Sequence, residues 1–234
     1  MPEHSRAAAE VWSDPAFAEA WLRADPAGPA DLLALPRRIA AALIGHDLAT
    51  PKLIVDVASG AGAFLSVLLD AFPEARGVWT DASPAMLEQA RERLGRFGER
   101  VEFLLADMAE LRAAGVPGDA DVLCTSRASH HLDRTELHGF YQEAAGLLRP
   151  GGWLVNLDHV GPDEDVWDRR YRAVRTRFTG PASARTAHHH RYPLPSVADH
   201  LDGYRAAGLT DADVAWKAFY SCLFVGRKGS EASG

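Results

Sequence analysis

The feature that most constrains the fold of this chain is a regular alternation of short apolar runs with helical patterns. Five apolar runs recur along the first two thirds of the sequence, at 53–57, 77–80, 101–105, 121–125 and 153–157. Helical patterns at 62–71, 84–95 and 133–148 lie between them. Ser83 and Pro84 predict the N-cap and first position of the second helix, and the run from Arg149 to Gly152 is expected to stop the third. Short buried strands joined by helices form a mainly parallel sheet, because a parallel connection needs a crossover that covers one face of the sheet. The sequence therefore predicts an α/β fold with helices on both faces.

The two ends of the chain depart from this alternation. Residues 11–45 have a helical pattern, with breaks expected at Pro26, Pro29 and Pro36. Residues 214–219 and 221–225 are strand-like runs too close together for a helix, so they predict an antiparallel hairpin at the edge of the sheet. Two further helices are expected between 161 and 208, as a cap over the carboxyl edge of the sheet. We thus expect a helical lid at 1–45, an α/β core at 46–160, a helical cap at 161–208 and a hairpin at 209–228.

Composition limits the surroundings in which the protein works. The formal charge of -7 argues against a protein that lives on nucleic acid, whose affinity depends on neutralising phosphates. The N-terminus has no apolar signal core, and no stretch approaches the length of a spanning helix, so we expect a cytoplasmic protein without a membrane partner. Cys124 and Cys222 are the only cysteines and give neither a disulfide framework nor a zinc spacing.

The first candidate site is the loop from Asp56 to Gly62, which follows the first predicted strand and opens a helix. Its small residues allow the backbone to turn sharply and to approach a ligand closely. Ligands of open parallel sheets bind beyond the carboxyl ends of the strands, which is where this loop lies. The loop therefore predicts a site for a nucleoside-bearing ligand. A dinucleotide fits less well, because the third glycine of that fingerprint is missing.

Two carboxylates follow the next two strands. Asp81 comes directly after the second strand, where a carboxylate can accept both hydroxyls of a ribose. Asp107 follows the third strand, where it could accept the amine of adenine while Met108 packs on the ring. Either carboxylate could instead serve only a helix start, because acidic residues are favoured there. Taken in order along the sheet edge, the two predict that an adenosine is held beside the loop.

These stretches resemble the class I S-adenosylmethionine-dependent methyltransferases of the small-molecule type. The resemblance covers roughly residues 50 to 160, in the segments IVDVASGAG, WTDASPAMLEQAR, LLADMAEL, DVLCTSRASHHL and LLRPGGWLV. It implies a Rossmann-like, seven-stranded sheet of order 3-2-1-4-5-7-6 with strand 7 antiparallel. It also implies S-adenosyl-L-methionine as the cofactor. The family usually has glycine where Ala58 stands, so a distorted cofactor pose would be found there first.

The resemblance also assigns residues to the parts of the cofactor. Asp56, Ala58 and Gly60 would hold the methionine end, with Gly62 closing the loop. Asp81 with Ala82 would hold the ribose. Asp107 and Met108 would hold the adenine, and Ser126 and Arg127 would line the sulfonium end.

Candidate general bases follow the fourth and fifth strands. Methyl transfer to a protonated acceptor is helped by a base, and the pKa of histidine is well matched to that task. The candidates are His131, His130 and His159, and the alternative is that these histidines only pack at a helix start. The residues expected in the substrate pocket are Asp158, His159, His189 and Tyr171. Because His188, His189 and His190 are consecutive and point in different directions, no metal site is predicted.

The predicted function is methyl transfer to an oxygen, carbon or nitrogen of a small molecule, as in secondary metabolism. One alternative is an RNA-directed methyltransferase, supported by the arginine-rich helix around 169–177. Another is a cyclase, lyase or regulatory protein that binds the same cofactor without transferring its methyl group. The sequence leaves the acceptor open, and it leaves open whether the chain forms a homodimer.

Overall fold

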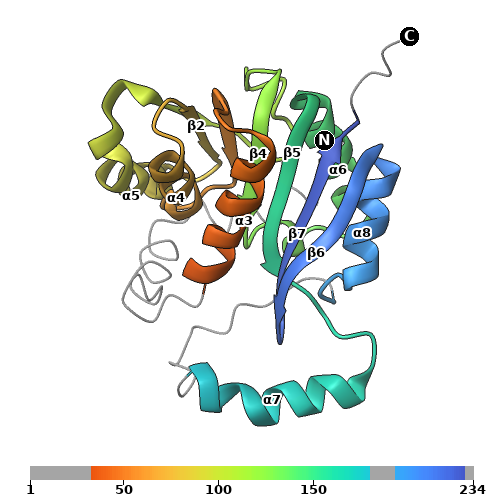
Figure 1. Ribbon diagram of the computed structural model, residues 1–234. Coiled ribbons are helices and arrows are strands. Elements are labelled where there is room, and N and C mark those ends of the chain that lie inside the picture. The colour runs from red at the N-terminus through yellow and green to blue at the C-terminus, as the bar shows by residue number, and fades with distance from the viewer. Residues whose placement is uncertain (1–32, 180–192, 230–234) are drawn as a thin grey trace.

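The computed structural model describes residues 33–179 and 193–229. Seven strands form one sheet in the order β3-β2-β1-β4-β5-β7-β6. Strands β1 to β5 run parallel, whereas β7 is antiparallel to both β5 and β6 (Figure 1). Their bounds are Leu53–Val57 (β1), Arg76–Asp81 (β2), Val101–Leu105 (β3), Ala120–Ser126 (β4), Leu148–His159 (β5), Leu209–Ala218 (β6) and Ser221–Lys228 (β7). The predicted fold class and strand order are confirmed.

Helices cover both faces of this sheet and enclose two apolar clusters. One face carries α3 (Ala34–Asp47), α4 (Ala63–Ala71) and α5 (Pro84–Leu94), and the other carries α6 (Arg134–Leu147) and α8 (Val197–Ala206). Side chains alternate along the strands, so Ile54 joins the first cluster and Val55 the second. Among the described residues, no helix combines the length and apolar character needed to cross a bilayer.

Two helix starts follow the local sequence closely. Ser83 caps α5 by accepting a hydrogen bond from the N–H of Met86, and Pro84 occupies the first helical position, as predicted. Asp133 caps α6 with a full capping box, in which its side chain and that of Glu136 each accept a backbone N–H from the other residue. The helix that follows β4 is therefore started by Asp133 and not by the histidines before it.

Two predicted boundaries are wrong. Pro36 does not break a helix, because it lies in the first turn of α3, where no helical hydrogen bond needs its missing N–H. The run from Arg149 to Gly152 ends α6 as predicted, but it also belongs to β5, which begins at Leu148 and not at Trp153. A Cβ on Gly152 would lie 2.9 Å from the carbonyl oxygen of Ala120, so only glycine allows this close approach to β4.

The two helices expected in the cap differ in their surroundings. Helix α8 packs against α6 and the hairpin and buries Tyr204 completely, so it covers the sheet instead of capping its edge. Helix α7 (Asp165–Thr179) lies beyond the edge at which β5 ends, apart from the other helices (Figure 1). The division of the chain into lid, core, cap and hairpin stays a prediction, since residues 1–32 and 180–192 lie outside the described residues.

Candidate active site

The loop after β1 adopts the backbone conformation that its small residues predict. Ala58, Gly60 and Gly62 all have left-handed φ angles, of 49°, 55° and 78°. A Cβ on Gly62 would lie 2.7 Å from the side chain of Leu94, so this glycine is required for packing against α5. A Cβ on Gly60 would meet nothing closer than the sulfur of Met86 at 4.0 Å. The Gly60 backbone is therefore open on the side where a ligand would approach.

Strand β2 holds this loop in place through one backbone hydrogen bond and two hydrogen bonds with its side chains. The N–H of Ser59 donates to the carbonyl of Thr80 at 2.9 Å, and the N–H of Gly60 donates to Asp81 Oδ2 at 2.8 Å. The indole N–H of Trp79 donates to the carbonyl of Gly60 at 2.8 Å. Both polar groups of Gly60 are thus satisfied from the neighbouring strand, so groups of the protein itself fix the backbone conformation of the loop.

The side chain of Asp56, at the end of β1, holds the loop through hydrogen bonds. It is fully buried, and its Oδ2 accepts hydrogen bonds from the Ser59 hydroxyl at 2.5 Å and from the N–H of Leu65 at 3.1 Å. Burial raises the pKa of the Asp56 carboxyl to about 6, against the lowering effect of these two hydrogen bonds. Asp56 therefore connects β1, the loop and the first turn of α4 through a single side chain.

Asp81 stands at the end of β2 with its side chain directed at the loop. Its Oδ1 accepts from the N–H of Ser83 at 2.9 Å, and its Oδ2 accepts from Gly60 as described above. Burial raises the pKa of Asp81, and these backbone hydrogen bonds oppose the rise. Each carboxylate oxygen can accept two hydrogen bonds, so both oxygens retain capacity for the hydroxyls of a ribose. Ala82 follows, half-buried, between Asp81 and the start of α5.

Asp107 and Met108 lie together after β3, both half-buried. Asp107 Oδ1 accepts from the N–H of Ala109 at 2.9 Å, so this side chain also shapes its own turn. The N–H of Ala106 donates to the carbonyl of Asp81 at 3.0 Å, which joins the ends of β2 and β3. Met108 packs on the apolar cluster beneath it. The predicted ribose and adenine residues are therefore brought to one edge of the sheet.

Ser126 and Arg127 end β4 next to this loop. Arg127 has a left-handed φ of 55°, and its N–H donates to the carbonyl of Leu157 in β5 at 3.0 Å. The hydroxyl oxygen of Ser126 is buried and makes no hydrogen bond to any described residue. A buried polar atom without a partner costs free energy unless a ligand or water satisfies it. The position of Ser126 fits one that a bound ligand completes.

His130 and Asp158 form a buried pair at the ends of β4 and β5. The ring Nδ1 of His130 lies 2.5 Å from Asp158 Oδ1, and the backbone N–H of His130 donates to Asp158 Oδ2 at 3.0 Å. Burial alone would raise the pKa of Asp158. The charge and hydrogen bond of His130, with further contributions from His159 and Ser129, hold it well below its usual range. An ionised carboxylate only accepts hydrogen bonds, so the proton of this pair lies on His130 Nδ1.

The other two candidate histidines flank His130. The ring centroid of His131 lies 4.1 Å from that of His130, and the His159 centroid lies 5.1 Å away in an edge arrangement. His130 is 3% exposed, whereas His131 and His159 are half-buried. The structure therefore gathers the three predicted bases, with Asp158, into one cluster.

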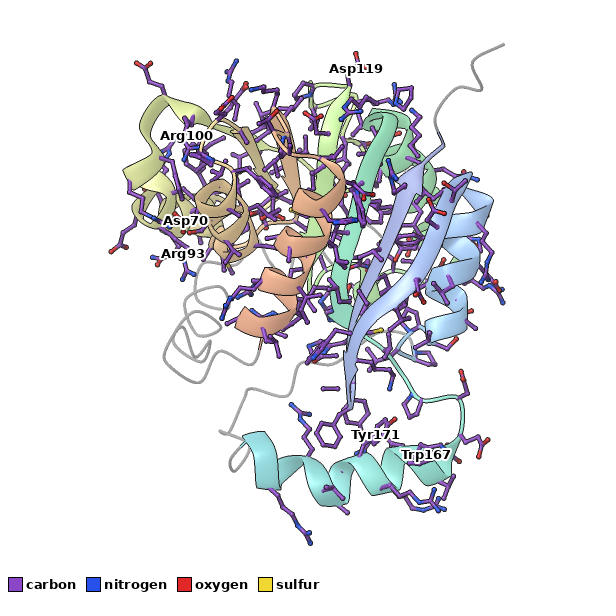
Figure 2. All side chains as sticks on the ribbon, in the orientation of Figure 1. Asp70, Arg93, Arg100, Asp119, Trp167 and Tyr171 are labelled. Carbon is purple, nitrogen blue, oxygen red and sulfur yellow. The ribbon has the colours of Figure 1, made fainter. Side chains whose placement is uncertain are left out.

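The remaining residues predicted for the substrate pocket lie apart from this cluster or outside the described ranges. Tyr171 in α7 packs on the turn of the hairpin, with ring centroids 5.7 Å from Phe219 and 5.5 Å from Tyr220 (Figure 2). Its hydroxyl accepts a hydrogen bond from Lys217 Nζ at 3.2 Å. His189 lies outside the described residues. A role for Tyr171 toward substrate would thus act through the hairpin turn, and it stays a prediction.

Three of the five α7 arginines contact side chains of their own surroundings. Arg172 pairs with Asp168 at 2.7 Å, Arg170 lies over the ring of Trp167, and Arg175 lies over the ring of Tyr220. These are the contacts of a solvated helix face, and they give the RNA-directed alternative no structural support. Within 33–179 and 193–229, no group of three His, Cys, Asp or Glu side chains is arranged to hold a metal ion.

Sequence reasoning missed the polar residues behind the His130–Asp158 pair. These are Ser129, Asn156, Tyr141 and His200, and all four are buried. A signal for one of them was present, because Asn156 interrupts the apolar run from Trp153 to Leu157. A polar residue inside a buried strand needs partners, and here the partners come from three other elements.

Comparison with known proteins agrees with this geometry. Residues 54–152 match a family described as "Methyltransferase domain". The chain is 32% identical over 194 residues to trans-aconitate 2-methyltransferase of Methylobacterium radiotolerans, covering 69% of this chain and 70% of that protein. It is 35% identical over 116 residues to 3-amino-4-hydroxybenzoate 4-O-methyltransferase of Streptomyces cremeus, covering 49% of this chain but only 31% of that protein.

A solved structure shares the fold over a greater length. An O-methyltransferase family protein from Burkholderia thailandensis superposes with a TM-score of 0.68 and 21% identity, over 95% of this chain and 62% of that one. The chain belongs to the class I S-adenosylmethionine-dependent methyltransferases. It spans about a third of the length of the Streptomyces relative, so its own activity and acceptor are matters for proposal.

The residues present fit the cofactor of this family. The open backbone at Gly60, the two oxygens of Asp81 and the unsatisfied hydroxyl of Ser126 lie along one edge of the sheet, at the ends of three strands. These groups match the methionine, ribose and sulfonium parts of S-adenosylmethionine in the order that the sequence predicts. The cofactor assignment is confirmed at the level of the family, while the contact of each residue stays a prediction.

Proposed function

We propose that this protein transfers a methyl group from S-adenosylmethionine to a hydroxyl oxygen of a small-molecule acceptor, with His130 as the general base. The observation that carries the proposal is the buried His130–Asp158 pair, which lies at the strand ends next to the cofactor loop. The name of one relative, 3-amino-4-hydroxybenzoate 4-O-methyltransferase, supports a hydroxyl oxygen as the acceptor. The name of another, trans-aconitate 2-methyltransferase, supports only an acceptor of modest size.

The cofactor supplies an electrophilic methyl carbon bonded to a positively charged sulfur, so the chain has to position the acceptor and remove its proton. Because His130 Nδ1 donates to Asp158, the other nitrogen, Nε2, is the basic one. His130 Nε2 would take the proton of the acceptor hydroxyl as the oxygen bonds to the methyl carbon, while the carbon–sulfur bond breaks and S-adenosylhomocysteine leaves. Asp158 stays ionised and stabilises the imidazolium that results, since its pKa lies well below its usual range.

The half-buried rings of His131 and His159 then border the acceptor on either side of the base. We propose Asp56, Ala58, Gly60, Gly62, Asp81, Ala82, Asp107, Met108, Ser126 and Arg127 as the cofactor site. Positioning is the main contribution of such a site, because an in-line displacement requires the acceptor oxygen, methyl carbon and sulfur to be collinear.

The test is release of S-adenosylhomocysteine by the purified protein. S-adenosylmethionine is supplied with a panel of phenols and carboxylic acids that includes 3-amino-4-hydroxybenzoate and trans-aconitate. We expect release with at least one hydroxyl-bearing acceptor, loss of release when that hydroxyl is already methylated, and loss of release in His130→Gln. Cofactor binding without release over the whole panel, or release only after addition of RNA, would contradict the proposal.

A further inference from the structure

A chain of buried hydrogen bonds continues from Asp158 away from the active site. The Ser129 hydroxyl lies 2.5 Å from Asp158 Oδ2, and Asn156 Nδ2 lies 2.8 Å from both Ser129 Oγ and the Tyr141 hydroxyl. The Tyr141 hydroxyl in turn lies 2.5 Å from His200 Nδ1. These hydrogen bonds thus run from Asp158 in β5 through Tyr141 in α6 to His200 in α8. They link the proposed base to two helices that cover the same face of the sheet.

The chemistry of these groups fixes the direction of every hydrogen bond. Asp158 is ionised, so the Ser129 hydroxyl donates to it. Burial lowers the pKa of His200 to about 4, against the raising effect of the Asp158 and Asp199 charges, so His200 is neutral near pH 7. Its Nδ1 therefore accepts the hydrogen of the Tyr141 hydroxyl. The two N–H bonds of the Asn156 amide remain, and one donates to Ser129 while the other donates to Tyr141.

This pattern rules out proton conduction along the chain. A relay needs each group to accept a proton on one side and to donate one on the other, whereas the Asn156 nitrogen donates on both sides. What the amide can do is hold the Ser129 oxygen in place and polarise its O–H bond toward Asp158. The network is therefore suited to orienting Asp158 and not to moving its proton.

The position of Asn156 gives a second reason to assign it a role. Its neighbours Val155 and Leu157 are fully buried, and its own side chain has no exposure. Burying an amide costs free energy that an apolar residue at the same position would not incur. The amide at position 156 therefore costs stability, and this cost is explained if its two hydrogen bonds have a function.

We propose that Asn156 and Ser129, anchored by Tyr141, are positioning residues that hold Asp158 and thereby keep His130 in the tautomer protonated on Nδ1. Asp158 accepts from Ser129 and the His130 N–H on Oδ2, and from His130 Nδ1 and the His159 N–H on Oδ1. With both contacts to Oδ2 in place, the carboxylate cannot rotate, and Oδ1 stays aimed at the ring. The inference rests on the proposed function only in naming His130 as the base.

The experiment reads the tautomer of His130 directly, without substrate. The full chain is labelled with ¹⁵N-histidine, and the ring nitrogens of His130 are assigned by their loss in His130→Gln. We expect a single tautomer protonated on Nδ1 in the natural protein and a mixture of tautomers in Asn156→Leu. Phe140→Leu is the matched control, because Phe140 is also buried beside Tyr141, at 5.4 Å between ring centroids, and its side chain has no group that can hydrogen-bond.

If Asn156→Leu does not fold, Tyr141→Phe and Ser129→Ala ask the same question with smaller changes. An unaltered His130 tautomer in the folded variants, or an equal change in Phe140→Leu, would overturn the inference. Turnover is measured in parallel with the first acceptor that the natural protein methylates, and we expect kcat to fall about five- to tenfold in Asn156→Leu with KM unchanged. An altered tautomer with unchanged kcat would keep the positioning role and refute His130 as the base.

Discussion

The two halves of the sheet edge hold their site residues in different ways. The ends of β1, β2 and β3 form the cofactor half, and the ends of β4 and β5 form the base half. On the β1–β3 side, the loop after β1 is held to β2 at three separate points, one from the backbone of Thr80 and two from the side chains of Trp79 and Asp81. On the β4–β5 side, the contacts that orient His130 come mainly from side chains. A loop held at three separate points loses only one of them when a side chain is changed, whereas a linked side-chain network fails when one member is lost. The cofactor half should therefore be robust and the base half fragile.

The largest expected effect comes from removing the charge at the centre of the base half. Asp158→Asn should lower kcat by about a hundredfold or more, because an amide in place of the carboxylate can neither fix the Nδ1–H tautomer of His130 nor stabilise its imidazolium form. The dissociation constant of S-adenosylmethionine, measured by calorimetry, should stay within about twofold. Asp70→Asn, at an exposed pair with Arg96, is the control. A kcat within threefold of the natural protein would remove Asp158 from the mechanism.

The two halves should also respond to pH with opposite signs. The pKa of Asp56 is raised to about 6 when folded, so its contribution to the free energy of unfolding falls as pH rises from about 4 to 6. The pKa of His200 is lowered to about 4, so its contribution grows as pH rises from about 4 to 6.5. Each amounts to about 3 kcal/mol on the conversion of 1.36 kcal/mol per pKa unit.

Because these two contributions to the free energy of unfolding oppose each other in the natural protein, each is measured in a variant that lacks only one of the two residues. Urea unfolding of Asp56→Asn between pH 4 and 6.5 should show stability increasing with pH relative to the natural protein, and His200→Phe should show the reverse. Parallel pH profiles for both variants would show that neither residue titrates as its burial predicts.

In the cofactor half, the side chain with the greatest expected effect is Asp81. Asp81→Ala should weaken S-adenosylmethionine binding by at least about tenfold, because it leaves the ribose hydroxyls unpaired and frees the N–H of Gly60. At saturating cofactor, kcat should change much less, which separates this variant from Asp158→Asn. Glu88→Ala, with an exposed side chain on the neighbouring helix, should bind normally. An unchanged dissociation constant would exclude Asp81 from the ribose site.

The smallest expected effect tests whether the loop backbone is strained. Ala58 has a φ of 49°, which costs a residue with a Cβ about 1–2 kcal/mol, whereas glycine adopts it freely. Ala58→Gly should therefore raise the free energy of unfolding by about 0.5 kcal/mol, after allowing for the greater freedom of glycine in the unfolded chain. Ala42→Gly, at an exposed position in the middle of α3, should lower it by about 1 kcal/mol. Equal losses in both variants would show that Ala58 carries no strain.

Much of the fold could be predicted because its signals are local. The bounds of β1 and β3 match the apolar runs at 53–57 and 101–105, and Ser83 caps its helix as expected. The extent of β5 could not be predicted, because residues 148–152 become a strand only through pairing with β4. The packing of α8 could not be predicted for a similar reason, since a helical pattern does not identify the surface against which the helix packs.

The sequence by itself determined the sheet, the left-handed loop after β1 and the placing of Asp81, Asp107 and the histidines at strand ends. These follow from residue periodicity and turn chemistry, which act over a few residues. Only the tertiary structure decided that Asp158 pairs with His130, 28 residues away, and that Tyr141 meets His200, 59 residues away. Such contacts depend on strand register and on the packing of helices across the sheet, and neither is a property of any short stretch of chain.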